Sequence, residues 1–445
     1  MKKKISEDSK NSKHEISVVR EQFTGRNMTR FGGSGLIRPF FKRHKIQQML
    51  DRNIKVEGRR KSKYSVSNLL VRCLYGMLLG YSRPYQMKIL CADKVFQKIA
   101  GFCGFPVQST ISRFLSSVRV SVSRQISALN FELLMEFRKR FKGLEAITLD
   151  LDSHVIPVYG NQQRAAMGYN PKKKGRKSYH PLLCFVGETR DYIGGMLRSG
   201  KHHSSYKRVE FVKGLVKKLP SHIKKIRLGA DSGFFNTELI KYLVKEGIKF
   251  AIVVPMQPWV QRKIRHMRAW HSIGWGIAVG ECSYIVNRYI TLRMVVIRQR
   301  VKANAGPRKQ LKLLNTGEVK YDYQVIVTNS GKGPEEVWRF YNQRACCENF
   351  IKEGTYSLGL DKMVSHSYAG NSTWFELLML GYNLMNLFKE EVLNQNKTKA
   401  MVATIRDRLF LIPGKLVHTA RKWVVKLEAT WAYRAEYEEA LARAG

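Results

Sequence analysis

Acidic residues are scarce in this sequence, which has 34 aspartates and glutamates against 79 lysines and arginines in 445 residues. The resulting formal net charge of +45 opposes compaction by self-repulsion unless a polyanion neutralises it. The shortage of acids therefore predicts a nucleic-acid partner, held largely through phosphate contacts that weaken with salt. Charge alone does not distinguish DNA from RNA, because ribosomal and RNA-binding proteins are equally basic.

Paired cysteines and long apolar runs are also missing. The seven cysteines form no Cys-x-x-Cys pair and no zinc-like Cys/His spacing, which argues against a zinc site and predicts reduced thiols in a cytosolic protein. No apolar segment follows Met1, and no run of about 18 apolar residues occurs elsewhere. We therefore expect a soluble, intracellular protein, and 44% hydrophobic residues are enough to build its core.

The length exceeds the ~100–200 residues of one typical domain, so several domains are expected. Residues 1–35 are polar, basic and glycine-rich, and they predict a flexible basic arm; an arm that becomes ordered on DNA is the alternative. Residues 36–143 show helical periodicity and predict an all-α DNA-binding domain. Residues 372–445 also show a helical, amphipathic pattern and predict a helical C-terminal region.

One segment of the N-terminal domain has the character of a recognition helix. Pro106 ends the preceding helix, and Ser109 or Thr110 is a candidate cap for the next one. That helix would present Arg113, together with Gln108, near its exposed beginning, as a helix-turn-helix protein does in the major groove. An ordinary capped helix of an all-α domain explains the pattern equally well.

The central region has the pattern of an α/β domain. Residues 146–152 alternate with the period of a strand and carry Asp150 and Asp152 on one face. Further strands are expected at residues 182–186, 191–198, 226–231 and 250–255, with helices at 207–219 and 236–247. This order predicts an RNase H-like mixed sheet flanked by helices. We assign the domain to residues 144–255 and 331–371, interrupted by a β-rich insertion at 256–330.

Asp231 stands at the C-terminal tip of one of these strands, where an open α/β sheet places its ligand crevice. A third acid, Glu348, lies in a later segment that is expected to be helical. If Tyr341 is position i of that helix, Arg344 is position i+3 and Glu348 is position i+7. That spacing predicts that all three side chains share one helix face. Carboxylates from three elements suit Mg²⁺, which prefers carboxylate and water oxygens. Two such ions can clamp the attacking and leaving oxygens of a DNA phosphodiester.

A basic, turn-rich segment at residues 168–181 follows the acidic strand. Bases are expected to stack on its tyrosines while its cations neutralise phosphates. The candidate DNA contacts in this segment are Tyr169, Lys172, Lys173, Lys174, Arg176, Lys177 and Tyr179.

Together these motifs resemble a known family. Asp-Leu-Asp-Ser at 150–153, Ala-Asp-Ser-Gly-Phe at 230–234 and Tyr-x-x-Arg-x-x-x-Glu at 341–348 look like the catalytic core of bacterial insertion-sequence transposases of the DDE type. The chain is most similar to the branch marked by a Tyr-Arg-Glu-Lys signature and a β-rich insertion before the last acid. Residues 168–183 are similar to one family within that branch. The resemblance covers about residues 30–430.

The resemblance implies that Asp152 or Asp150, together with Asp231 and Glu348, holds two Mg²⁺ or Mn²⁺ ions. It also implies cleavage at inverted-repeat ends, joining of the 3′-OH to target DNA, and a homodimer in the synaptic complex of a bacterial cytoplasmic protein associated with the nucleoid. Tyr341 and Arg344 match the signature.

This sequence departs from the family pattern at two positions. The signature lysine, seven positions after the acid, is Thr355 here, and Lys352 or Lys362 is the candidate substitute. His154 stands where relatives often carry threonine.

Two other functions remain compatible with these residues. One is a DNA- or RNA-binding protein without catalysis, which Mg²⁺-dependent nicking of DNA would exclude. The other is an RNase H-like nuclease that cuts and never joins, which a strand-transfer assay with a pre-cut 3′-OH end would distinguish from a transposase.

Overall fold

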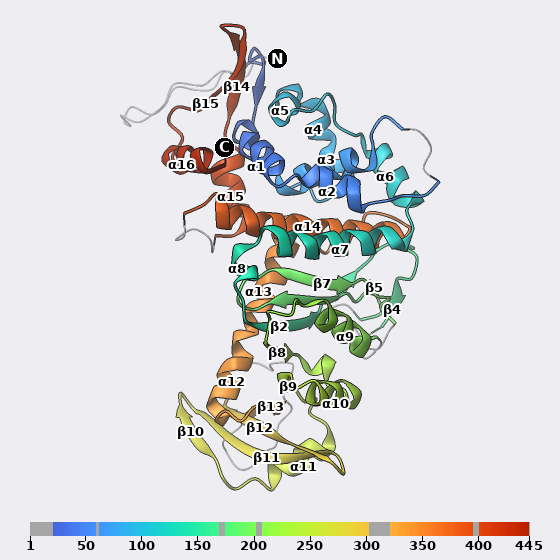
Figure 1. Cartoon of the computed structure of the whole chain (residues 1–445), viewed down its shortest axis with the longest axis vertical. Coiled ribbons are helices and arrows are strands. Elements are labelled where there is room, and N and C mark those ends of the chain that lie inside the picture. The colour runs from blue at the N-terminus through green and yellow to red at the C-terminus, as the bar shows by residue number, and fades with distance from the viewer. Residues whose placement is uncertain are drawn as a thin grey trace, which may run out of the picture.

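The computed structural model describes residues 21–58, 62–168, 174–201, 207–301, 321–394 and 400–444. A large mixed sheet occupies the centre and one end of the elongated molecule, and a layer of helices covers the other end (Figure 1). Within these ranges, no helix combines the length and the apolar character that crossing a membrane requires.

The central sheet has nine strands in the order β10-β11-β12-β13-β9-β8-β2-β6-β7. Strand β2 is parallel to β8, and β8 is parallel to β9. The other neighbouring pairs are antiparallel. The strands are β2 (Ala146–Ser153), β6 (Leu182–Val186), β7 (Tyr192–Met196), β8 (Lys225–Ala230), β9 (Lys249–Val253), β10 (His271–Gly274), β11 (Ile277–Asn287), β12 (Ile290–Arg300) and β13 (Tyr321–Thr328).

The predicted mixed sheet flanked by helices is confirmed. Strands β2, β6 and β7 form an antiparallel meander, and the chain then alternates through α9 (Arg208–Lys218), β8, α10 (Thr237–Lys245) and β9. The alternation in β2 places Ile147, Leu149 and Leu151 in a core with residues of α9 and α10. Asp150 and Asp152 therefore face the opposite side of the sheet, because successive side chains of a strand alternate.

The described part of the expected insertion at 256–330 contains strands β10, β11, β12 and β13, and these do not form a sheet of their own. Strand β13 pairs with β9, with Val327 opposite Ile252. Residues of β12 and β13 also share one hydrophobic core with β2 and β8. Helix α11 (Pro258–Arg265) covers this part of the sheet. The insertion therefore extends the central sheet beyond β9, where the strand at 250–255 was expected to end the series.

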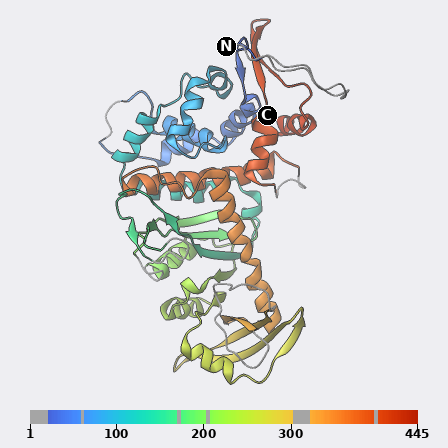
Figure 2. The ribbon, with the colours of Figure 1, turned by 180° about the vertical axis from the view of Figure 1, so that it is seen from behind.

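Two long helices, α7 (Val120–Phe137) and α14 (Tyr368–Glu391), run side by side between the sheet and the N-terminal helices (Figures 1 and 2). Asn383 of α14 connects the layers, because its Nδ2 donates to Asn130 Oδ1 and to the Tyr192 carbonyl, both at 2.7 Å. One hydrophobic core includes the N-terminal helices, α14 and Phe185 of the sheet. The predicted boundaries at 143 and 371 therefore do not separate independent cores.

The other described elements between residues 36 and 143 are mainly helices. They are α1 (Ile37–Arg43), α2 (Ile46–Asn53), α3 (Val66–Leu78), α4 (Lys88–Ala92), α5 (Lys94–Ala100), α6 (Gln108–Ser117) and the short α8 (Lys139–Lys142).

The predicted flexible arm is wrong for its described C-terminal part. Strand β1 (Met28–Thr29) pairs with the C-terminal strand β14 (Gly414–Thr419), and Phe31 is fully buried. The glycines that follow permit close packing: a Cβ on Gly33 would lie 2.0 Å from the Leu409 carbonyl oxygen. These glycines therefore mark tight contact with the C-terminal region. Residues 1–20 lie outside the described ranges.

The predicted helical C-terminal region is also only partly correct. Strands β14 (Gly414–Thr419) and β15 (Lys422–Leu427) form an antiparallel hairpin that pairs with β1, and α16 (Arg434–Ala444) follows. The alternation Leu-Val-His-Thr and Trp-Val-Val-Lys favours strands over a helix in this segment. The two ends of the chain therefore share one small sheet.

Candidate active site

Asp152 and Asp231 lie at the same end of two parallel neighbouring strands. Asp152 is the penultimate residue of β2, and Asp231 directly follows β8. The register pairs Leu151 with Ala230, so the two acids are level across the strand pair. The Asp231 carboxylate lies close enough to Asp152 to raise the pKa of the Asp152 carboxyl. The sheet therefore brings together two acids that are 79 residues apart in the sequence.

The Ser-Gly turn after Asp231 has a local structural reason. A Cβ on Gly233 would lie 2.9 Å from Asp231 Oδ1, so the turn leaves room for the carboxylate only because residue 233 has no side chain. The backbone N–H of Gly233 also stabilises the ionised carboxylate. Asp231 Oδ1 is itself buried and has no hydrogen-bond partner among the described residues. A buried acceptor of this kind suits a cation.

Glu348 completes the predicted acidic set. It lies in the first turn of α13 (Ala345–Glu353), a helix that packs against β2. Its charge contributes to raising the pKa of Asp152, which places the two carboxylates near one another. Asp152 therefore lies between Asp231 on the neighbouring strand and Glu348, which is exposed on α13.

Tyr341, Arg344 and Glu348 do not share a single helix as predicted. Helix α12 (Pro334–Gln343) ends one residue before Arg344, and α13 begins one residue after it. The turn at Arg344 keeps the predicted neighbours together nevertheless, because its Nη1 donates to the Tyr341 hydroxyl at 3.3 Å.

Arg344 points into the acidic cluster. Its Nη2 lies 3.2 Å from Asp152 Oδ1, and its Nε and Nη2 both donate to the Leu151 carbonyl at 3.3 Å. Burial alone lowers the pKa of this guanidinium, but the Asp152 carboxylate, the Tyr341 hydroxyl and Asp231 raise it above its ordinary value. Arg344 therefore supplies a positive charge that partly balances the carboxylates of Asp152 and Asp231.

Asp150 occupies a deeper position than Asp152 on the same strand face. It is only 3% exposed, and its carboxylate oxygens lie against Gly187 and Gly229, whose missing side chains make room for it. Burial raises the pKa of Asp150 to about 7, against the attraction of Arg344 and with a further contribution from Glu188. The acids that raise the pKa of Asp150 are Glu188 and Asp152, whereas Asp231 and Glu348 raise that of Asp152, so Asp152 is the acid nearer to both partners.

Burial also raises the pKa of Asp152 to about 7, opposed by Arg344 and reinforced by Asp231 and Glu348. The pKa of Asp231 is raised by burial as well, against the attraction of Arg344 and Arg208. Within the described residues, no three acid, histidine or cysteine side chains converge tightly enough to hold a metal ion as they stand. The chemistry of the donors nevertheless fits Mg²⁺ or Mn²⁺, since all are carboxylates and one buried oxygen lacks a partner.

Two buried arginines beside Asp231 escaped the sequence analysis. Arg198 follows β7 and donates from Nε to the His180 carbonyl at 2.9 Å. Arg208 is the first residue of α9 and lies 5.2 Å from the ring of Phe234. Burial lowers the pKa of each to about 10, and each attracts the Asp231 carboxylate. Their positions at a strand end and at a helix start, on the side of the sheet where Asp231 lies, are the signal that could have identified them.

The predicted DNA contacts of the basic segment are only partly accessible. Part of this segment forms strand β5 (Lys177–Tyr179), which lies between β3 (Ile156–Pro157) and β4 (Ala166–Met167) in a small sheet. Lys174, Arg176 and Lys177 are exposed. Tyr179 is fully buried, and its hydroxyl donates to the Gln163 carbonyl. The prediction that Tyr179 stacks on bases is therefore wrong. Tyr169, Lys172 and Lys173 lie outside the described residues.

The other predicted contact residues lie on exposed helix surfaces. Arg113 is exposed on α6, and Lys352 is exposed on α13. Helix α6 begins at Gln108 after Val107, so neither Ser109 nor Thr110 caps it. Thr355 lies in a helical turn after α13 (Gly354–Leu358). Of the two candidate substitutes for the signature lysine, Lys362 forms an ion pair with Asp361.

Comparison with known proteins gives two findings. A family model described as transposase DDE domain group 1 matches residues 11–444. Among solved structures, the chain is similar to a piggyBac transposase in a synaptic complex with hairpin DNA, seen by cryo-electron microscopy, with 13% sequence identity and a TM-score of 0.46. That likeness covers 87% of this chain and 82% of the other. No curated protein matches.

Proposed function

Because the chain belongs to the DDE transposases, we propose that it cuts DNA at the inverted-repeat ends of a mobile element and joins the freed 3′-OH to target DNA. The observation that carries this proposal is that Asp152 and Asp231 lie level at one end of two parallel strands, with Glu348 within electrostatic reach of Asp152. The strand order of the meander and its α/β continuation supports an RNase H-like core for this site.

Asp152, Asp231 and Glu348 are the proposed ligands of two Mg²⁺ or Mn²⁺ ions. When bound, such ions supply an activated water or 3′-OH and stabilise the leaving oxygen of an in-line displacement. DDE transposase domains generally use divalent metal ions. The orphaned Oδ1 of Asp231 supports this assignment, and Asp150 is assigned a supporting role beneath Asp152.

The arginines around the acids have a separate proposed role. Arg344 holds Asp152 by an ion pair in the protein without DNA. Guanidinium groups also bind phosphate oxygens through paired hydrogen bonds. We assign Arg344 to orient Asp152 and to attract the phosphate that reacts. Arg198 and Arg208, which lie beside Asp231, favour the ionised form of that carboxylate and so oppose the effect of its burial.

DNA is the proposed partner of the remaining positive charge. Lys174, Arg176, Lys177, Arg113 and Lys352 are exposed and are assigned to the DNA backbone. The net charge of +45 predicts binding that weakens steeply with salt. Synapsis of two element ends requires that two sites act together, so we propose a homodimer in the DNA complex.

The test uses a plasmid that carries the inverted repeats flanking this reading frame. Asp152→Asn, Asp231→Asn and Glu348→Gln should each abolish Mg²⁺-dependent cleavage while retaining binding to the repeats. Glu238→Gln, an exposed acid on α10, is the matched control and should cleave as the wild type does. Strand transfer is measured separately with a pre-cut 3′-OH end. Cleavage at the wild-type rate by Asp231→Asn would refute the site assignment.

A further inference from the structure

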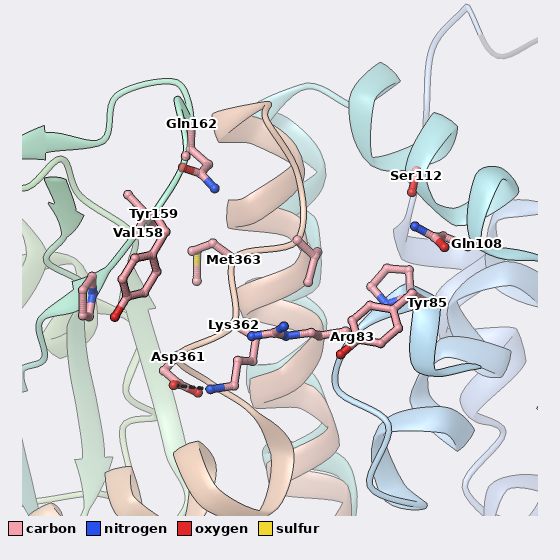
Figure 3. Close-up of a pocket in the computed structure, with 14 residues that line it drawn as sticks. Arg83, Tyr85, Gln108, Ser112, Val158, Tyr159, Gln162, Asp361, Lys362 and Met363 are labelled. Atoms are coloured by element: carbon pink, nitrogen blue, oxygen red, sulfur yellow. Dashed lines mark hydrogen bonds and ion pairs between the residues drawn. The ribbon is translucent and has the colours of Figure 1, made fainter. Parts of the chain in front are cut away.

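A groove lies between the N-terminal helices and the small β3-β5-β4 sheet, on the flank of the molecule. Its cavity of about 530 Å³ is bordered on one side by a short helical turn (Pro84–Met87) and α6, and on the other by residues 157–162. Lys362 and Met363 lie between the two sides (Figure 3). We call this cavity the tyrosine groove after Tyr85 and Tyr159, which face it from opposite sides.

Both tyrosines expose their rings to an unusual degree. Tyr85 is 52% exposed and Tyr159 is 68% exposed. Large aromatic side chains are normally covered, because burial of their apolar surface is favourable. Each ring also has an arginine beside it: the Arg83 guanidinium lies 6.0 Å from the ring centre of Tyr85, and the Arg176 guanidinium lies 5.2 Å from that of Tyr159. Arg83, Tyr85 and Tyr159 therefore line one cavity, and Arg176 adds a positive charge beside the Tyr159 ring.

Polar groups that recognise base edges line the same cavity. Gln108 and Ser112 of α6 face it from the side of Tyr85, and Gln162 faces it from the side of Tyr159 (Figure 3). Gln162 Oε1 is buried without a hydrogen-bond partner among the described residues. Amide side chains carry both hydrogen-bond donors and acceptors, and can therefore pair with the donors and acceptors on a base edge.

The charge of the groove favours an anion. Among the described residues that line the cavity, Asp361 is the only acid, and Lys362 forms an ion pair with it at 2.5 Å. Arg83 and Arg176 then remain as the excess positive charge around the two rings. A ligand that carries both flat aromatic faces and negative charge complements this arrangement.

From these contacts we propose that the tyrosine groove binds unpaired nucleotides of a DNA strand, with bases stacked on Tyr85 and Tyr159 and phosphates held by Arg83 and Arg176. Proteins that bind single strands combine aromatic platforms with cationic grooves in this way. The cavity volume falls within the roughly 300–1,000 Å³ of small-ligand sites. A blunt duplex offers its base faces only at its ends, so its interior bases cannot occupy the groove. The proposal rests on the proposed function only in taking DNA as the polymer.

The test measures fluorescence anisotropy of a short single-stranded thymidine oligonucleotide and of a blunt-ended duplex without unpaired nucleotides, both in EDTA. Tyr85→Ala and Tyr159→Ala should each weaken single-strand binding roughly 5- to 150-fold, the range expected for loss of one stacked base. Duplex binding should change less than twofold. Tyr159→Phe keeps the ring and should keep the single-strand affinity.

Tyr289→Ala is the matched control, because Tyr289 is 76% exposed and has the Arg288 guanidinium 4.5 Å from its ring centre, yet lies in the β11–β12 turn. It should leave single-strand binding unchanged. The proposal is overturned if the groove variants weaken single-strand binding no more than this control does, or if they weaken both DNA forms equally. Loss of single-strand affinity in Tyr159→Phe would also overturn it, because stacking does not need the hydroxyl.

The outcome is independent of the proposed catalysis. Binding in EDTA does not involve the metal-dependent reaction, and Asp152→Asn should keep the tyrosine-dependent preference. Wild-type protein that cleaves DNA but lacks this preference would overturn the groove and leave the transposase function standing. Tyrosine-dependent binding in a protein that never cleaves DNA would support the groove and refute the transposase function.

Discussion

Replacing Asp150 with asparagine should separate the two acids that compete for the first position of the site. If Asp152 is the functional ligand and Asp150 a buried support, Asp150→Asn should retain cleavage, whereas Asp152→Asn should abolish it. The same change should stabilise the protein, because a buried carboxylate that resists ionisation is replaced by a neutral side chain of the same shape.

The size of that stabilisation follows from the pKa of Asp150, which burial raises from 3.8 to about 7. Between these values the folded protein keeps the proton and the unfolded chain releases it. The contribution of Asp150 to stability is therefore fully present below about pH 4 and is lost as the pH rises to about 7. At about 1.4 kcal/mol per pKa unit, the loss amounts to roughly 4 kcal/mol. Because asparagine does not titrate, the Asp150→Asn protein does not suffer this loss of stability.

Urea unfolding of both proteins in EDTA, from pH 5 to pH 8, measures this effect. The advantage of Asp150→Asn in unfolding free energy should grow by about 1.4 kcal/mol per pH unit up to about pH 7 and then level off. A difference that does not depend on pH would refute the reasoning about burial. Loss of cleavage by a folded Asp150→Asn protein would show that Asp150 is itself a ligand.

Three further predictions follow from other contacts. Arg138 and Asp191 form a buried ion pair, with Arg138 Nε 3.0 Å from Asp191 Oδ2. Arg138→Met should lower the unfolding free energy by about 3–5 kcal/mol, because the buried carboxylate loses its partner. An unchanged urea midpoint would contradict this. Mg²⁺ should raise the unfolding temperature of the wild type but not of Asp231→Asn, and equal shifts in a thermal melt would argue against ligation. Gly359→Ala should destabilise the fold, because φ is +76° and a Cβ would lie 2.2 Å from Ser82 Cβ; circular dichroism melts should show a lower midpoint, and an unchanged one would count against this packing.

The sequence by itself determined the part of the site that local patterns specify. The strand alternation around Asp152 and the strand-end position of Asp231 each depend on residues a few positions apart. Because parallel neighbouring strands end at the same edge of a sheet, two acids at strand ends were bound to meet once the strand order was right. The mixed sheet and the N-terminal helices followed from the same short-range periodicities.

Tertiary structure decided what depends on contacts between distant segments. No local pattern shows that Arg344 turns toward Asp152, or that Arg198 and Arg208 surround Asp231. The basic segment contains several tyrosines, and only packing buries Tyr179 while leaving Tyr159 exposed.

The two ends of the chain illustrate the same division. Glycines 32 and 33 suggested flexibility, but they pack against the C-terminal region, which itself contains a hairpin. The hydrophobic effect acts on total buried surface and carries no directional code. Which distant segments pack together, and which side chains that packing exposes, is therefore settled by the whole fold.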